Sequence, residues 1–81
     1  MSFRMTVKLP RVADTVDDVV IQSWEVDEGD RVEVGTILMH VETDKALVEV
    51  PSPVAGVITE KLVATDDEIT TGTPIAVVQG D

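Results

Sequence analysis

The sequence predicts an all-β domain in which two similar small antiparallel sheets pack together with approximate two-fold symmetry. Three observations lead to this prediction. Valine, isoleucine and leucine supply most of the 43% hydrophobic residues, and aromatic residues make up only 2%, a composition that suits thin packed sheets. Apolar residues recur at every second position in short segments, as in half-buried strands. The third observation is an internal repeat.

The repeat appears when the sequence is shifted by 37 residues, which places Val20-Ile21 on Val57-Ile58 and Gly35-Thr36 on Gly72-Thr73. Strand, tight turn, short strand, Gly-Thr turn and strand therefore occur twice. We expect each sheet to take strands from both halves of the chain. The last strand should pair with the first, so that the two termini meet at the end opposite Lys45.

Extended segments are expected at residues 5–10, 19–26, 31–34, 37–43, 46–50, 57–63, 68–70 and 75–78. Pro10 confines the first segment to a sheet edge or a strand end. Residues 11–18 are predicted to form a loop, residues 27–30, 65–67 and 72–74 turns, and residues 51–53 a break in the ladder. Trp24 is predicted to lie in the core or at its margin. With 81 residues, the chain is predicted to be one domain, residues 1–81, with a core of about 5–79.

The segments 37–43 and 46–50 are predicted to form a hairpin with Asp44 and Lys45 as the two central turn residues. The pairs would be Thr43 with Ala46, Val41 with Val48, and Met39 with Val50. This register puts the large apolar pairs on one face. The opposite face would carry Glu42, His40 and Glu49, with Leu47 as the one apolar misfit.

Composition excludes several functions. The net charge of −10 repels phosphate backbones, so we expect no nucleic-acid partner, and it favours basic surfaces on other proteins. We expect no membrane partner, because no apolar stretch approaches spanning length. The absence of cysteine leaves no thiol chemistry. His40 is the only histidine and is expected to be a plain strand residue opposite Glu49. With one histidine and no cysteine, we expect no catalytic site in this domain. No metal-ligand spacing occurs, so we expect no metal site.

Lys45 has two interpretations. A lysine at a hairpin tip is commonly a solubilising turn residue, but it is also a group that a modifying enzyme can reach without unfolding its substrate. Only Lys8, Lys45 and Lys61 are lysines, against 16 acidic residues.

The motif Glu42-Thr43-Asp44-Lys45-Ala46, with the following Val48 to Gly56, resembles the lipoyl domains of the 2-oxo acid dehydrogenase complexes. The resemblance runs from about Val7 to Val78. It implies a flattened β-barrel, or sandwich, with the lipoyl-lysine at a hairpin tip. It also implies that Lys45 carries lipoic acid in amide linkage, as the swinging arm of a dihydrolipoamide acyltransferase subunit.

Several partners follow from the resemblance. Free lysine amines are protonated at neutral pH, so a lipoate ligase or lipoyl transferase must attach the group. A thiamine-diphosphate 2-oxo acid decarboxylase would load the acyl group. The acyltransferase catalytic domain would pass it to coenzyme A, and dihydrolipoamide dehydrogenase would reoxidise the arm. The location would be cytoplasmic in a bacterium or the mitochondrial matrix in a eukaryote.

The family pattern also implies that Glu42, Asp44, Ala46 and Gly29 help the modifying enzyme to choose its target. Each position has a plainer interpretation. Glu42 can simply solvate the outer face of the hairpin. Gly29 can be required only by a turn with positive φ; its repeat mate Asp66 is a residue type that tolerates such turns. Gly56 is expected to allow a bend or a close backbone approach.

Three alternatives remain open at this stage. A biotinyl carrier shares the fold, but its lysine normally lies between two methionines, whereas Asp44 and Ala46 flank Lys45. A lipoyl-like module with a structural or adaptor role often lacks the tip lysine. A glycine-cleavage carrier is longer and has additional helical segments.

Overall fold

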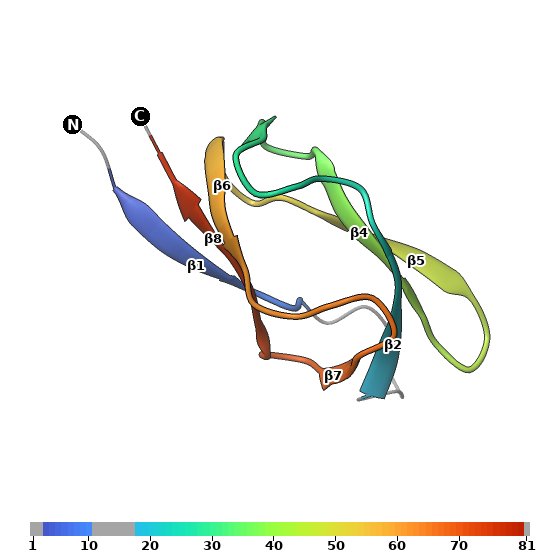
Figure 1. The fold of residues 1–81 in the computed structure, drawn as a ribbon. Helices are drawn as coiled ribbons and strands as arrows, with labels where there is room; N and C mark the ends of the chain where they lie inside the picture. Colours follow the sequence, from blue (N-terminus) through green and yellow to red (C-terminus); the bar gives the residue numbers. More distant parts are fainter. Residues whose placement is uncertain (1–2, 11–17, 81) are drawn as a thin grey trace.

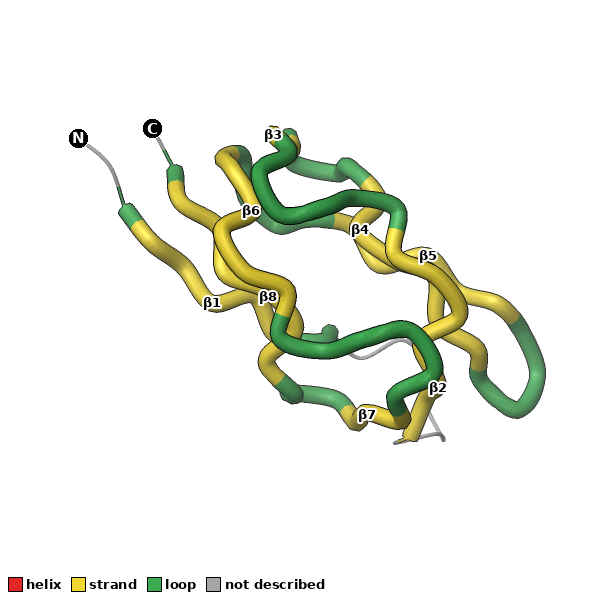
Figure 2. The backbone as a smooth tube through the Cα atoms, in the orientation of Figure 1, coloured by secondary structure: helices red, strands yellow, loops and turns green. Residues whose placement is uncertain are grey.

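The computed structural model describes residues 3–10 and 18–80, and within them it contains strands and no helix (Figure 2). The strands are β1 (Arg4–Lys8), β2 (Asp18–Trp24), β3 (Arg31–Val32), β4 (Ile37–Glu42), β5 (Leu47–Pro51), β6 (Gly56–Lys61), β7 (Glu68–Thr70) and β8 (Pro74–Gln79). Each corresponds to one extended segment expected from the sequence. The predicted all-β class is therefore confirmed.

The strands form two four-stranded sheets, and all their pairings are antiparallel. The order is β1-β8-β6-β3 in one sheet and β5-β4-β2-β7 in the other. Figure 1 shows the β4–β5 hairpin at one end of the molecule and the outer ends of β1 and β8 at the other. Arg4 at the start of β1 pairs with Gln79 at the end of β8, so the last strand pairs with the first, as predicted.

The repeat seen in the sequence is also a repeat of hydrogen bonds. The Gly29 amide donates to the Ile58 carbonyl at 2.7 Å, and the related Asp66 amide donates to the Ile21 carbonyl at 2.8 Å. Both turn residues have positive φ, 95° for Gly29 and 76° for Asp66. The two halves therefore use the same turn, and each turn bonds to a strand from the other half.

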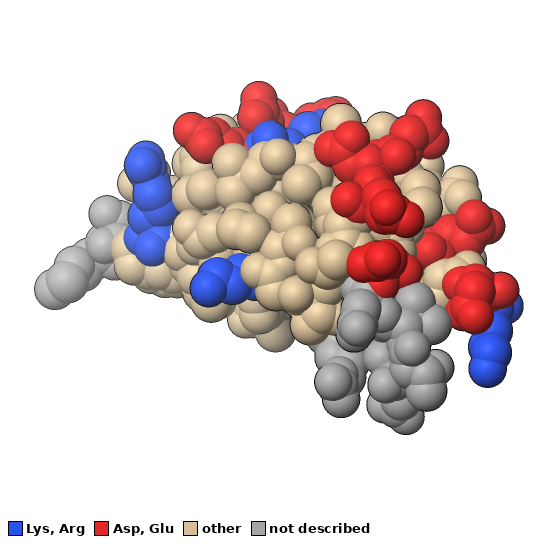
Figure 3. Space-filling model, turned by 90° about the horizontal axis from the view of Figure 1, so that it is seen from below, with Lys and Arg blue, Asp and Glu red and all other residues tan. Residues whose placement is uncertain are grey.

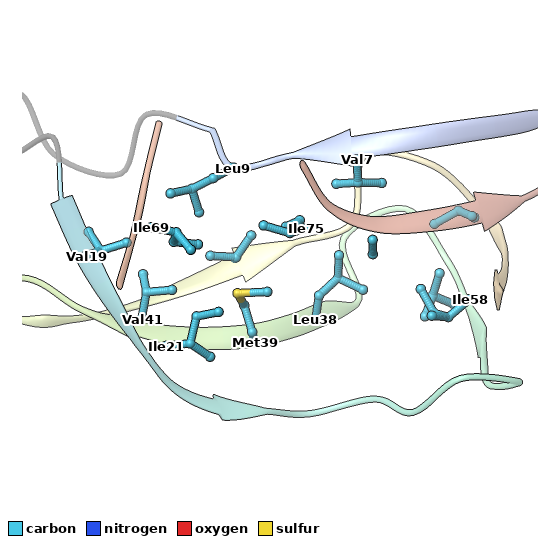
Figure 4. Close-up of a cluster of buried hydrophobic side chains, with 14 residues drawn as sticks. Val7, Leu9, Val19, Ile21, Leu38, Met39, Val41, Ile58, Ile69 and Ile75 are labelled. Atoms are coloured by element: carbon cyan, nitrogen blue, oxygen red, sulfur yellow. The ribbon is translucent and has the colours of Figure 1, made fainter. Parts of the chain in front are cut away.

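The core lies between the two sheets and draws side chains from both (Figure 4). Its buried members are Val7, Leu9, Val19, Ile21, Val32, Leu38, Met39, Val41, Val50, Ile58, Ile69, Ile75, Ala76 and Val78. Trp24 packs against this cluster at its margin, where its indole Nε1–H donates to the Val63 carbonyl at 3.0 Å. The predicted position of Trp24 is confirmed.

Some element boundaries were predicted wrongly. Asp18 opens β2 and pairs with Thr70 instead of closing a loop; the remainder of that expected loop, residues 11–17, lies outside the described residues. Pro51 is the last residue of β5 and Pro74 the first of β8. Both are tolerated because β5 is an edge strand and Pro74 stands at a strand start, where no ladder N–H is needed.

The strict alternation expected for the segment 37–43 fails at its beginning. The register between β4 and β5 shifts between Ile37 and Met39. This irregularity turns Leu38 into the core beside Met39 and leaves Ile37 half-buried. A β-bulge places an extra residue in one strand and therefore reverses the facing of the residues before it.

Candidate functional site

The β4–β5 hairpin has the register that the sequence predicts. Met39 pairs with Val50 and Val41 with Val48. The Thr43 amide donates to the Ala46 carbonyl at 2.9 Å, which leaves Asp44 and Lys45 as the two central residues of the turn. The hairpin therefore displays Lys45 at its tip, where the residue is exposed.

The two faces of the hairpin differ as expected. Met39, Val41 and Val50 are fully buried and Val48 is half-buried. Leu47, the predicted misfit, is 58% exposed. Burial of the inner face anchors both strands on the core, so the tip projects from a rigid base.

A side-chain hydroxyl also holds the turn. The Thr43 Oγ1 accepts hydrogen bonds from the Lys45 amide at 3.2 Å and the Ala46 amide at 3.0 Å. It donates in turn to the Ala46 carbonyl at 3.1 Å. Threonine in front of a turn can form such local bonds, but the alternation that predicts the hairpin does not indicate them.

The surroundings of Lys45 are acidic. Figure 3 shows acidic side chains gathered over the part of the face that lies toward the hairpin. Asp44 and Glu42 are exposed beside Lys45 in the hairpin. Among the described residues, Lys61 and Arg31 form ion pairs with acidic side chains, whereas Lys45 forms none. The Lys45 amine is thus presented to solvent within a negative field.

The structure brings together three of the four predicted recognition residues. Glu42, Asp44 and Ala46 belong to the hairpin, and Glu42 lies between Leu47 and Val20 in the sheet. Their roles in target selection remain predictions.

Gly29, the fourth predicted recognition residue, lies elsewhere. Within β2, the stretch from Val20, which pairs with Glu42, to Trp24, which pairs with Met39, spans about 13 Å at the usual rise. Gly29 follows in the next turn, bonded to Ile58 of the other sheet. Its positive φ supports the plainer interpretation that the turn requires glycine.

His40 has one partner that the sequence predicted and one that it did not. Its Nε2 lies 3.6 Å from Glu49 Oε2, across the β4–β5 pair. Its Nδ1 lies 3.0 Å from Glu25 Oε2, which also accepts a 2.7 Å hydrogen bond from the Ser23 hydroxyl. The pKa of the Glu25 carboxyl is lowered mainly by the hydrogen bond from Ser23 and to a smaller extent by the hydrogen bond with His40. A register shift between Ile21 and Ser23 creates this arrangement and could not be read from alternation.

Gly56 permits a close approach of backbone to backbone, which confirms its structural interpretation. A Cβ at this position would overlap the carbonyl oxygen of Gln79 in the neighbouring strand β8.

In the part of the chain that the structure describes, no three His, Cys, Asp or Glu side chains are grouped so as to hold a metal ion. The same part contains no helix long and apolar enough to cross a membrane.

Comparison with known proteins gives a consistent result. A family profile described as "Biotin-requiring enzyme" matches residues 5–78. The chain is 41% identical over 73 residues to a dihydrolipoyllysine-residue acetyltransferase component of the pyruvate dehydrogenase complex from Corynebacterium glutamicum. It is 40% identical over 72 residues to a dihydrolipoyllysine-residue succinyltransferase component of the 2-oxoglutarate dehydrogenase complex from Staphylococcus saprophyticus. These matches cover 90% and 89% of this chain but only 11% and 17% of the two relatives.

The fold is also that of a solved structure. The solution structure of the lipoyl domain of the 2-oxoglutarate dehydrogenase complex from Azotobacter vinelandii superposes with a TM-score of 0.70 and 25% sequence identity. The match covers 90% of this chain and 92% of that one. Profile, sequence relatives and fold agree, and the chain therefore belongs to the biotin- and lipoyl-attachment family and has the fold of its lipoyl domains.

Proposed function

We propose that this chain is a lipoyl carrier in which Lys45 bears lipoic acid in amide linkage. The observation that carries the proposal is the display of Lys45: an exposed amine at the tip of a hairpin whose base is buried on one face. The motif around it, from Glu42 to Ala46, is that of the lipoyl family. The flanking Asp44 and Ala46 favour lipoate over biotin, since the biotinyl lysine normally lies between methionines.

Attachment is an acyl transfer to the Lys45 Nζ. The neutral amine attacks the carbonyl carbon of an activated lipoyl donor, the carbon–nitrogen bond forms, the activating group leaves, and the amine loses a proton. The hairpin itself supplies only access, because among the described residues no side chain forms a hydrogen bond or ion pair with the Lys45 Nζ, and the Thr43 hydroxyl contacts only the Lys45 main chain. A ligase or transferase must therefore perform the chemistry, and the amide removes the positive charge of Lys45.

The attached lipoyl group supplies a dithiolane that can accept an acyl group together with two electrons. The domain contributes a rigid base and a tether, which raises the local concentration of the acyl group at successive enzymes. The relatives belong to 2-oxo acid dehydrogenase complexes. Accordingly, we propose a 2-oxo acid decarboxylase, an acyltransferase catalytic domain and dihydrolipoamide dehydrogenase as partners, within a dihydrolipoamide acyltransferase subunit. The proposed location is the bacterial cytoplasm or the mitochondrial matrix.

The proposal is tested by intact mass and peptide mapping after incubation with a lipoate ligase, lipoate and ATP. A parallel sample receives a biotin ligase, biotin and ATP. We expect one lipoyl amide on Lys45 and no biotin. Lys45→Arg should fold normally and take up no lipoate, while the matched variant Lys61→Arg should be modified like the wild type. Uptake of biotin would assign a biotinyl carrier, and no uptake of either group by a folded sample would assign a structural module.

A further inference from the structure

The turn at the tip of the β4–β5 hairpin has an uncommon backbone conformation for its length. Asp66 is the only non-glycine residue with positive φ in the described chain, so Asp44 and Lys45 both have negative φ. Two-residue hairpin loops usually have positive φ at one or both central positions, because those turns follow the strand twist. Such positions favour glycine and asparagine and would strain a lysine. A hairpin that displays a lysine here needs another source of order.

The Thr43 hydroxyl provides it. The Thr43 hydroxyl accepts hydrogen bonds from the Lys45 and Ala46 amides and donates one to the Ala46 carbonyl. The Ala46 carbonyl also accepts the Thr43 amide. One side chain thus fixes the peptide groups on both sides of Lys45.

The internal repeat shows that two strand ends can be joined by the closing hydrogen bond without this network. The hydroxyls of Thr36 and its repeat mate Thr73 each accept a hydrogen bond from a backbone amide, at 2.9 and 3.1 Å. This threonine hydrogen bond is therefore common to both halves. The residue related to Thr43 by the same shift is Gly80. Its amide repeats the closing bond, donating to the Phe3 carbonyl at 2.7 Å, but glycine has no hydroxyl to repeat the rest. Within residues 3–10 and 18–80, the hydroxyl network therefore occurs at the lysine end alone.

We propose that the Thr43 hydroxyl is a positioning group for the modification of Lys45, holding the Asp44–Lys45 turn in the shape that the lipoylating enzyme binds. This inference rests on the proposed function. Thr43 donates to and accepts from backbone groups, so it acts on Lys45 through the main chain and not on the reacting amine. Without the hydroxyl, the turn is held in the recognised shape for a smaller fraction of the time. The enzyme then needs more of the domain to reach the same rate, which raises KM and leaves kcat unchanged.

The test measures steady-state lipoylation of the 81-residue chain by a lipoate ligase, with lipoate and ATP saturating. Thr43→Val keeps the shape of the side chain and removes all three hydroxyl bonds, whereas Thr43→Ser keeps the hydroxyl. Thr36→Val is the matched control, since it removes a hydroxyl bond at a turn far along β4. We expect Thr43→Val to raise KM about tenfold, corresponding to a competent fraction of about one tenth, with kcat kept. Thr43→Ser and Thr36→Val should stay within about twofold of the wild type.

A chemical control separates positioning from access. Acetylation of Lys45 by an N-hydroxysuccinimide ester, followed by peptide mapping, should proceed equally fast in all variants, because the amine is exposed in each. Wild-type kinetics for Thr43→Val would overturn the inference, as would an equal loss in Thr36→Val or in chemical acetylation. Should Thr43→Val fail to fold by circular dichroism, Thr43→Ala takes its place under the same criteria. A wild type that takes up no lipoate would instead refute the proposed function itself.

Discussion

The two ends of this barrel are built alike and carry different chemistry. At one end β4 and β5 meet in the Lys45 turn, and at the other β8 and β1 meet at the termini. The same closing hydrogen bond occurs at both, from Thr43 to Ala46 and from Gly80 to Phe3. What the ends share therefore belongs to the fold. What differs, the lysine and the hydroxyl network beneath it, distinguishes the end at which we propose the function.

Charge separates the two ends as well. Each sheet has a cross-strand row of four residues near its end; in the lysine sheet it is Leu47, Glu42, Val20 and Glu68. The related row in the other sheet is Arg4, Gln79, Val57 and Arg31. The first row has two acids and the second two bases. A protein that approaches Lys45 meets a negative surface, which favours partners with a basic one.

The largest effect on stability is expected at Gly56, where the two halves differ because its repeat mate is Val19. Gly56→Ala should lower the free energy of unfolding by about 3 kcal/mol, since the added Cβ would overlap the Gln79 carbonyl. Gly29→Ala is the control: its Cβ meets no atom within 4 Å, so only the positive φ costs about 1 kcal/mol. Urea unfolding measures both, and equal losses would show that the close approach is unimportant.

A smaller effect distinguishes the two interpretations of Gly29. Gly29→Asp installs the residue type that occupies the related turn at Asp66, whose φ of 76° is also positive. We expect a loss of about 1 kcal/mol or less and an unchanged rate of lipoylation by the ligase. A stable variant that is lipoylated much more slowly would instead make Gly29 a recognition residue.

The smallest effect concerns acid stability and the outer face beside His40. Because the folded-state pKa of Glu25 is lowered from 4.5, its contribution to stability is present above that value. It is lost as the pH falls through the lowered folded-state pKa. Urea unfolding at pH 7 and pH 3 should therefore show a smaller acid loss for Glu25→Gln than for the wild type. Ser23→Ala should shift the response in the same direction, since the Ser23 hydroxyl is the main cause of the lowered pKa. An unchanged acid loss in both variants would show that this cluster contributes nothing.

Much of the fold could be predicted because its signals are local and repeated. Alternation predicted the pairing of Met39 with Val50, since a slip of one residue would turn the inward-facing apolar side chains of one strand away from the core. The shift of 37 residues predicted how the halves exchange strands. Polar residues at 27–30 and 65–67 marked the turns that bond to the opposite half.

The errors arose where tertiary structure overrides the local pattern. The register shifts between Ile37 and Met39 and between Ile21 and Ser23 change which side chains face inward. No residue type in these segments indicates a β-bulge. Pro51 was assigned to a break because the sequence does not reveal that β5 is an edge strand. At the candidate site, Lys45 was predicted from the motif and its place in the hairpin. The Thr43 network was missed, because hydrogen bonds of one hydroxyl to three backbone groups depend on the turn geometry.

The most direct test of the claim that turn geometry selects the lysine moves that lysine by one place. The double variant Asp44→Lys with Lys45→Asp keeps composition, net charge and exposure, and changes only the position within the turn. After incubation with lipoate ligase, lipoate and ATP, we predict a folded domain with no lipoyl adduct by intact mass. A lipoyl amide on the moved lysine, formed at the wild-type rate, would show that any exposed lysine at the hairpin tip is sufficient.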